Sequence, residues 1–205
     1  HGAMVQWVQI RNEQAASSRS GGRAQQGSRA AVTGGAHLRG VDALIAEEIR
    51  SAYAGGDVDL YRNRAATVAG FYRATKSWDL LVEHNGKPVL LVEYKSMSGS
   101  EGKNLNNRAD EMFGIAEDAR AAQENGILPP DLLRAFIFIM GANEESLRPV
   151  GVSKAVGVPD AAFIEASYMG RMAIMLERMR DAGLYHLVWA VGVYQDPFSW
   201  FEPSE

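Results

Sequence analysis

The sequence contains no cysteine, which excludes disulfide bonds and thiolate metal sites. No apolar run approaches the ~20 residues of a membrane-spanning helix, so we expect no membrane contact. The N-terminus also lacks the pattern of a signal peptide. With 46% hydrophobic and 22% charged residues among 205, the composition is typical of a soluble globular protein with one sizeable core.

We interpret residues 1–4, His-Gly-Ala-Met, as a tag remnant and residues 5–205 as a single domain. The net charge of −4 weighs only weakly against a nucleic-acid partner, because local fields decide binding. The charges are segregated along the chain. A basic cluster precedes the middle of the sequence and consists of Arg62, Arg64, Arg73 and Lys76.

Residues 17–35 are rich in glycine, serine and arginine. Such a composition is typical of a flexible linker. It also suits an arm that becomes ordered on DNA, with arginine side chains meeting phosphate. The sequence alone leaves both interpretations open.

Residues 37–53 have the apolar periodicity of an amphipathic helix, with Val41, Ile45 and Ile49 on one face. Glu48 falls on that same face, where a carboxylate is unexpected. It either reaches solvent at the edge of the face or contributes a further acidic group to the site described next. Gly55 and the glycine after it end the helix.

The stretch from Trp78 to Ser96 predicts a β-hairpin. Two runs rich in valine and leucine flank an Asn-Gly pair, Asn85-Gly86, which is the strongest short-range hairpin signal. The outer ends of a hairpin lie together, so Asp79 is expected beside Glu93 and Lys95, and the last two share a face because they are two residues apart.

Two carboxylates and an ammonium beside buried strands are costly unless they bind something. Oxygen ligands of this kind suit Mg²⁺, which we expect at Asp79, Glu93 and the backbone carbonyl of Tyr94. A bound Mg²⁺ polarises a phosphoryl oxygen and lowers the pKa of a bound water. Lys95 is then placed to orient or deprotonate the attacking water and to stabilise the developing negative charge.

The remaining elements follow from periodicity. We expect a strand over residues 67–72 beside the hairpin, a polar loop over 96–105, and helices over 108–124 and 162–182. Residues 132–140 and 185–194 predict buried strands. The methionines of the last helix are expected in the core rather than at a metal. The fold class is therefore α/β (α+β), a mixed sheet flanked by helices.

Four ordered segments together resemble the XhoI-type Type II restriction endonucleases of the PD-(D/E)XK nuclease superfamily. Asp79 followed by Glu93-Tyr94-Lys95 matches the superfamily motif. The segments that carry the wider resemblance are residues 29–37, 76–82, 93–96 and 104–108. The chain departs from the family pattern at Lys103 and Leu105, where the family has an asparagine and an aromatic residue.

The resemblance implies a homodimeric, Mg²⁺-dependent enzyme that cuts both strands of double-stranded DNA at the palindrome CTCGAG and leaves 5′ overhangs. It implies a prokaryotic, cytoplasmic protein with a cognate DNA methyltransferase. Asp79, Glu93 and Lys95 take the catalytic positions, and Glu48 is a further acidic candidate. The residues expected to contact DNA are Arg29, Thr33, His37, Lys76, Lys103, Asn104, Asn106, Asn107 and Arg108.

Three other functions remain open at this stage. The same catalytic core occurs in a repair or non-specific nuclease, which cuts without a fixed sequence. A catalytically inert DNA-binding module is the non-enzymatic alternative. A sugar or acyl hydrolase with Asp79 and Glu93 as an acid–base pair explains Lys95 and the arginine-rich segment less well.

Overall fold

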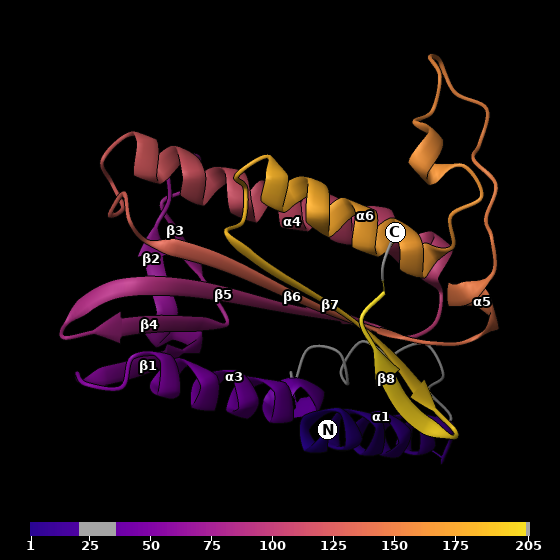
Figure 1. Ribbon diagram of the computed structural model, residues 1–205, viewed down its shortest axis with the longest axis horizontal. Coiled ribbons are helices and arrows are strands. Elements are labelled where there is room, and N and C mark those ends of the chain that lie inside the picture. Colours follow the sequence, from indigo (N-terminus) through magenta and orange to yellow (C-terminus); the bar gives the residue numbers. More distant parts are fainter. Residues whose placement is uncertain (21–35, 204–205) are drawn as a thin grey trace.

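The computed structural model describes residues 1–20 and 36–203. Its centre is a six-stranded mixed sheet with the order β1-β4-β5-β6-β7-β8. Helices lie on both faces of this sheet, α4 and α6 on one and α1 and α3 on the other (Figure 1). The expected mixed sheet flanked by helices is confirmed. Arg29 and Thr33 lie outside the described residues.

The predicted hairpin is present and supplies two neighbouring inner strands of the sheet. β4 (Leu80–His84) and β5 (Lys87–Met97) pair antiparallel, with Leu80 opposite Val92. Asn85 and Gly86 both have positive φ, 51° and 72°, as a tight turn between twisted strands requires. The turn sets the register of the first pairs, and a β-bulge that shifts the register between Val82 and Glu83 then brings Asp79 next to Glu93.

Two crossover helices cover one face of the sheet. β5, β6 (Leu133–Gly141) and β7 (Leu187–Gln195) run parallel, which requires the long connections through α4 (Glu101–Glu124) and α6 (Tyr168–Asp181). Alternate residues of the strands, such as Leu91 and Phe136, pack against these helices. The methionines of α6 are in this core as expected, with Met169, Met172 and Met179 at most 2% exposed.

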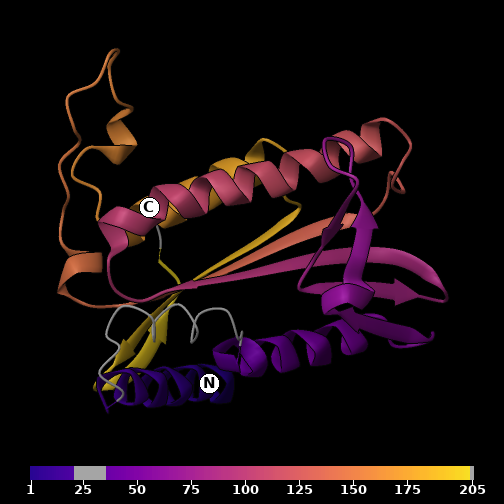
Figure 2. The ribbon, with the colours of Figure 1, turned by 180° about the vertical axis from the view of Figure 1, so that it is seen from behind.

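The opposite face is covered by α1 (Gly2–Ser20) and α3 (Arg39–Ala52), and the short helix η1 (Ala36–Leu38) directly precedes α3 (Figure 2). The other set of alternate strand residues, including Val92 and Ile137, packs here with Trp7 and Ile49. α1 begins at Gly2 and Met4 is buried, so residues 2–4 of the segment that we interpreted as a tag remnant are helical. Residues 17–20, the start of the segment interpreted as a linker or a DNA-binding arm, belong to the same helix.

Two predictions for elements near the site are wrong. β5 continues to Met97 and α4 begins at Glu101, so the expected polar loop is only a short turn. The strand expected beside the hairpin, β2 (Thr67–Ala69), pairs instead with β3 (Thr75–Ser77) in a separate two-stranded sheet. This β2–β3 hairpin rises from the sheet edge toward α4 (Figure 2).

The remaining elements close the sheet edges. β1 (Val58–Arg62) pairs with β4, and η2 (Asn63–Ala66) leads into β2. The short helices α5 (Glu144–Leu147) and η3 (Ala161–Phe163) lie between β6 and α6, which starts later than expected. The aromatic tail forms a further strand, β8 (Phe198–Phe201), on β7. In the described part of the chain, no helix is long and apolar enough to cross a membrane.

Candidate active site

Asp79 and Glu93 meet where β4 begins and β5 continues past it. Asp79 directly precedes β4, and its Oδ2 accepts a hydrogen bond from the backbone N–H of Tyr94 at 2.8 Å. The pairing of β4 with β5 ends at Leu80 and Val92, so this contact takes the place of a strand partner at Tyr94. The predicted convergence of Asp79 with the Glu93-Tyr94-Lys95 segment is therefore present in the structure.

Glu93 is the buried centre of the cluster, with 3% of its surface exposed. Its Oε1 contacts the ammonium of Lys95, and its Oε2 lies 3.1 Å from Nζ of Lys76. Lys76 also lies over the ring of Trp78, 5.5 Å from its centroid. A buried carboxylate is costly when unpaired, and these two cations compensate its charge.

Asp79 has an electrostatically unusual environment. Although part of the residue is exposed, withdrawal of its carboxyl from water raises its pKa, and the negative charge of Glu93 raises the pKa further. The hydrogen bond from Tyr94 and the charges of Lys95 and Lys76 act in the opposite direction. A carboxylate that is costly to ionise near a second one is a common feature of ligand-binding sites.

The donor chemistry of this cluster fits a hard divalent cation. Across residues 1–20 and 36–203, no three histidine, cysteine or acidic side chains are grouped closely enough to hold a metal by themselves. Two carboxylates, from Asp79 and Glu93, nevertheless suffice for Mg²⁺, which commonly completes its shell with waters and substrate phosphate oxygens. The Tyr94 carbonyl belongs to the strand residue between Glu93 and Lys95, while the Tyr94 phenol points the other way, toward Asp42 at 3.4 Å.

Glu48 and His37 are not brought to this cluster. Glu93 and Lys95 lie two and four residues after Leu91 and therefore share its face of the sheet, toward α4, whereas Glu48 is exposed on α3 beneath the other face. His37 is only 2% exposed, and its Nε2 lies 2.6 Å from Oγ of Ser96. Burial lowers the pKa of His37 to about 4, and Arg11 adds to this shift, so the ring is neutral at pH 7.

The proposed recognition segment is helical rather than a loop. Lys103, Asn106 and Asn107 are exposed at helical spacing on the first turns of α4. Asn104 and Arg108 are half-buried on a neighbouring stripe, where Arg108 pairs with Glu111 at 2.8 Å. All of them follow β5, the strand that carries Lys95, after only a short turn in the sequence.

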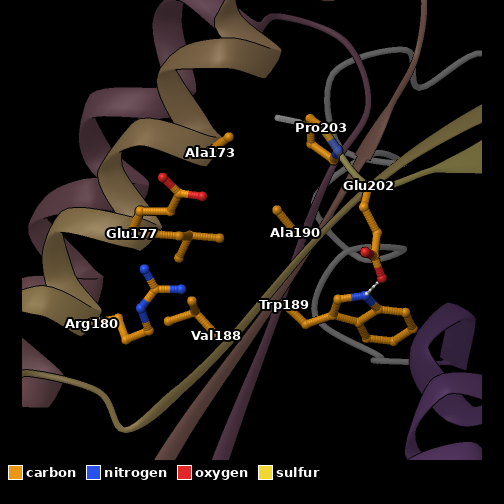
Figure 3. Close-up of a pocket in the computed structure, with 9 residues that line it drawn as sticks. Ala173, Glu177, Arg180, Val188, Trp189, Ala190, Glu202 and Pro203 are labelled. Carbon is orange, nitrogen blue, oxygen red and sulfur yellow. Dashed lines mark hydrogen bonds between the residues drawn. The ribbon is translucent and has the colours of Figure 1, made fainter. Parts of the chain in front are cut away.

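Two concave regions lie away from the catalytic cluster. A cavity of about 140 Å³ lies between α6 and β7, where Figure 3 shows the Glu202 carboxylate directed at the indole nitrogen of Trp189, 2.8 Å away. A larger apolar groove of about 490 Å³ lies under the sheet against α3 and includes Glu48. Neither is lined by Asp79, Glu93 or Lys95.

The sequence did not place Lys76 in the catalytic cluster, although it proposed this residue as a DNA contact. The available signal was the spacing of Lys76 and Trp78, which lie two residues apart just before Asp79 and therefore point to the same side of an extended chain. The role of Asp118 was missed altogether. This buried residue of α4 holds the tip of the β2–β3 hairpin, and no local pattern in a helix sequence announces such a long-range contact.

Comparisons with known proteins place the chain in a family. The family model described as restriction endonuclease XhoI matches residues 17–192. The Type II restriction enzyme XhoI of Xanthomonas vasicola is 34% identical over 77% of this chain and 65% of that enzyme. The Type II restriction enzyme BstVI of Geobacillus stearothermophilus is 30% identical over 75% of this chain and 71% of that enzyme.

A shorter match relates the chain to the Type II restriction enzyme AbrI of Azospirillum brasilense, with 41% identity over 33% of this chain and 32% of that enzyme. The chain thus spans about two thirds or less of the length of the Xanthomonas and Azospirillum relatives. No solved structure matches it. Because the family model covers most of its residues, this chain belongs to the XhoI restriction endonuclease family.

Proposed function

We propose that this protein is a Type II restriction endonuclease of the PD-(D/E)XK class, which hydrolyses phosphodiester bonds in double-stranded DNA with Mg²⁺. The observation that carries the proposal is the convergence of Asp79, Glu93 and Lys95 at one end of the β4–β5 hairpin. Membership of the XhoI family and relatives named as Type II restriction enzymes support it.

Each residue of the cluster has a separate role in this reaction. Asp79, Glu93 and the Tyr94 carbonyl would hold Mg²⁺, which when bound polarises the phosphoryl oxygen and acidifies a water. Lys95 orients the attacking water and stabilises the negative charge that develops on the phosphoryl oxygens. Lys76 supplies a second cation beside Glu93, where it attracts the phosphate backbone.

We further propose that the recognised site is the palindrome CTCGAG, cut to leave 5′ overhangs by a homodimer. A two-fold protein matches the two-fold symmetry of a palindrome. Lys103, Asn104, Asn106, Asn107 and Arg108 on α4 are the proposed contacts to base edges and phosphates. The cognate methyltransferase that protects the same site acts on DNA and not through contact with this chain.

The test is incubation of the protein with unmethylated plasmid DNA and Mg²⁺, followed by sequencing of the ends. Discrete fragments that end at CTCGAG with 5′ overhangs are expected. A smear would identify a non-specific or repair-type nuclease, and intact DNA with a gel shift would identify a binding module. Either result overturns the proposal.

A further inference from the structure

The tip of the β2–β3 hairpin presents two aromatic side chains to solvent. Phe71 is 43% exposed and Tyr72 is 69% exposed, and their rings contact edge to face with centroids 4.9 Å apart. The core of this domain contains neither ring. Exposed aromatic rings at the end of a projecting hairpin contribute little to folding and are typical of a contact surface.

The tip is nevertheless held in one conformation by a buried acid. Asp118 of α4 is 3% exposed, and its Oδ1 accepts hydrogen bonds from the backbone N–H groups of Phe71 and Tyr72, at 3.1 and 2.7 Å. Arg73 completes the anchor, with its Nε 3.2 Å from Oδ2 of Asp118 and its Nη2 3.1 Å from the carbonyl of Gly114. Desolvating a carboxylate to fix a surface loop is costly, which indicates that the position of the rings matters.

Gly70 is required for this arrangement. A Cβ atom at position 70 would lie 2.5 Å from Oδ2 of Asp118 and 2.6 Å from the backbone oxygen of Arg73. The tip therefore combines a glycine that permits close approach with an acid and an arginine that clamp it. Such a loop presents its aromatic rings without having to order them on binding.

The tip is also fixed relative to the catalytic cluster. The chain runs from the tip through β3 to Asp79, so both the chain and the Lys76–Glu93 ion pair connect the two. Lys76 follows Tyr72 by four residues, a stretch of chain that spans at most about 14 Å even when fully extended. A duplex with a phosphate at the cluster therefore also passes close to the tip.

The charge around the hairpin indicates the kind of partner. Arg64 is exposed in η2 at its base and makes no ion pair with any residue in the described ranges. Lys76 and Lys95 lie at the cluster below. Exposed rings on a hairpin that also carries an exposed arginine and leads to two half-buried lysines fit a nucleic-acid duplex, in which aromatic side chains pack on bases or wedge between base steps.

We propose that Phe71 and Tyr72 form an aromatic contact to duplex DNA that positions the duplex over the catalytic cluster. This inference rests on the proposed nuclease function and adds a substrate-binding element to it. The contact uses residues of the β2–β3 hairpin and is separate from the proposed base contacts at the start of α4. It acts through apolar packing and not through charge.

The test compares wild type with the double variant Phe71→Ala/Tyr72→Ala by fluorescence anisotropy on a labelled duplex containing CTCGAG. Ca²⁺ replaces Mg²⁺ so that binding is measured without cleavage. The double variant is expected to bind at least about tenfold more weakly, which corresponds to about 1.4 kcal/mol. The slope of log affinity against log salt should stay that of wild type, because no charge is removed.

Ile127→Ala is the matched control, because Ile127 is 44% exposed just beyond α4 and outside the hairpin. It should bind as wild type does, and thermal melting should show that both variants fold. Wild-type affinity in a folded double variant overturns this inference, while cleavage by wild type leaves the proposed function standing. If the double variant instead loses self-association without DNA, the rings form a protein contact and the inference is wrong. A wild-type protein that neither binds nor cuts DNA defeats the proposed function itself.

Discussion

Nζ of Lys76 lies 3.1 Å from Oε2 of Glu93, at the centre of the candidate active site. Glu93 thus has two ammonium groups beside it, since Lys95 contacts its other oxygen. Lys95 comes from β5 of the central hairpin, whereas Lys76 comes from the separate β2–β3 hairpin. The cluster therefore combines cations from two different hairpins around one buried carboxylate.

Lys76→Ala is expected to weaken binding to cognate and random duplexes alike. A lysine that contacts phosphate contributes to affinity without reading sequence, and its loss reduces the salt slope by about one. Anisotropy titrations over a range of salt concentrations in Ca²⁺ measure both quantities. An unchanged slope, or a loss confined to the cognate duplex, would contradict this role.

Mg²⁺ binding should weaken with acid at a higher pH than for an ordinary aspartate. The pKa of Asp79 is raised, first by burial and then by Glu93, and only its ionised form binds the cation. Affinity for Mg²⁺ is therefore full above the raised pKa and falls as the pH decreases through it. Calorimetric titration of the protein with Mg²⁺ across this pH range measures the effect, and Asp79→Asn should abolish binding.

The same shift has an opposite consequence for metal-free stability. A carboxyl with a raised pKa is favoured in its protonated form by the fold, so its ionisation destabilises the folded state as the pH rises. Asp79→Asn keeps an acceptor for the Tyr94 N–H and removes the charge. Without metal at neutral pH, we expect this variant to melt at a higher temperature than wild type. A lower melting temperature would show that Asp79 stabilises the fold.

Glu48→Gln should leave the rate of plasmid cleavage unchanged. Glu48 is exposed on α3, on the face of the sheet away from Glu93, and lies at an apolar groove. Glu93→Gln is the comparison, because it removes a buried charge from the cluster itself and should abolish cleavage. A loss of cleavage in folded Glu48→Gln would place this residue in the catalytic machinery despite its position.

Arg108→Ala should lower the preference for cognate over random DNA by about 1–3 kcal/mol if the side chain reads a base. In the free protein Arg108 pairs with Glu111, so DNA must compete for the guanidinium. Glu111→Gln is the matched control, because it frees Arg108 without removing it and should retain the preference. Equal cognate preference in Arg108→Ala and wild type would refute the recognition role.

The central hairpin could be predicted because its determinants are local. Asn85 and Gly86 tolerate positive φ, and the apolar runs on either side specify the strands. The one-residue register shift between Val82 and Glu83 that completes the approach of Asp79 to Glu93 has no such local signal, but the turn already places both residues at the same end of the hairpin. The chemistry of the site is readable from the sequence for the same reason.

The start of α4 could not be predicted from the same kind of signal. The sequence around Glu101 and Gly102 reads as a loop because glycine disfavours helices. In the fold Gly102 is packed closely against the hydroxyl of Tyr168 in α6, so a distant helix determines this glycine. Glu48 illustrates a related limit, because helical periodicity places a residue on a helix face but does not say which sheet face that helix covers.

The central claim is that the cluster around Glu93 cuts DNA, and Lys95→Ala tests it most directly. We expect wild type to convert plasmid to discrete fragments with Mg²⁺, and Lys95→Ala to cut at least about 10²-fold more slowly while still shifting DNA in Ca²⁺. Lys87→Ala removes an exposed lysine from the β4–β5 turn and should cut as wild type does. Cleavage by Lys95→Ala at the wild-type rate would show that the catalytic centre lies elsewhere.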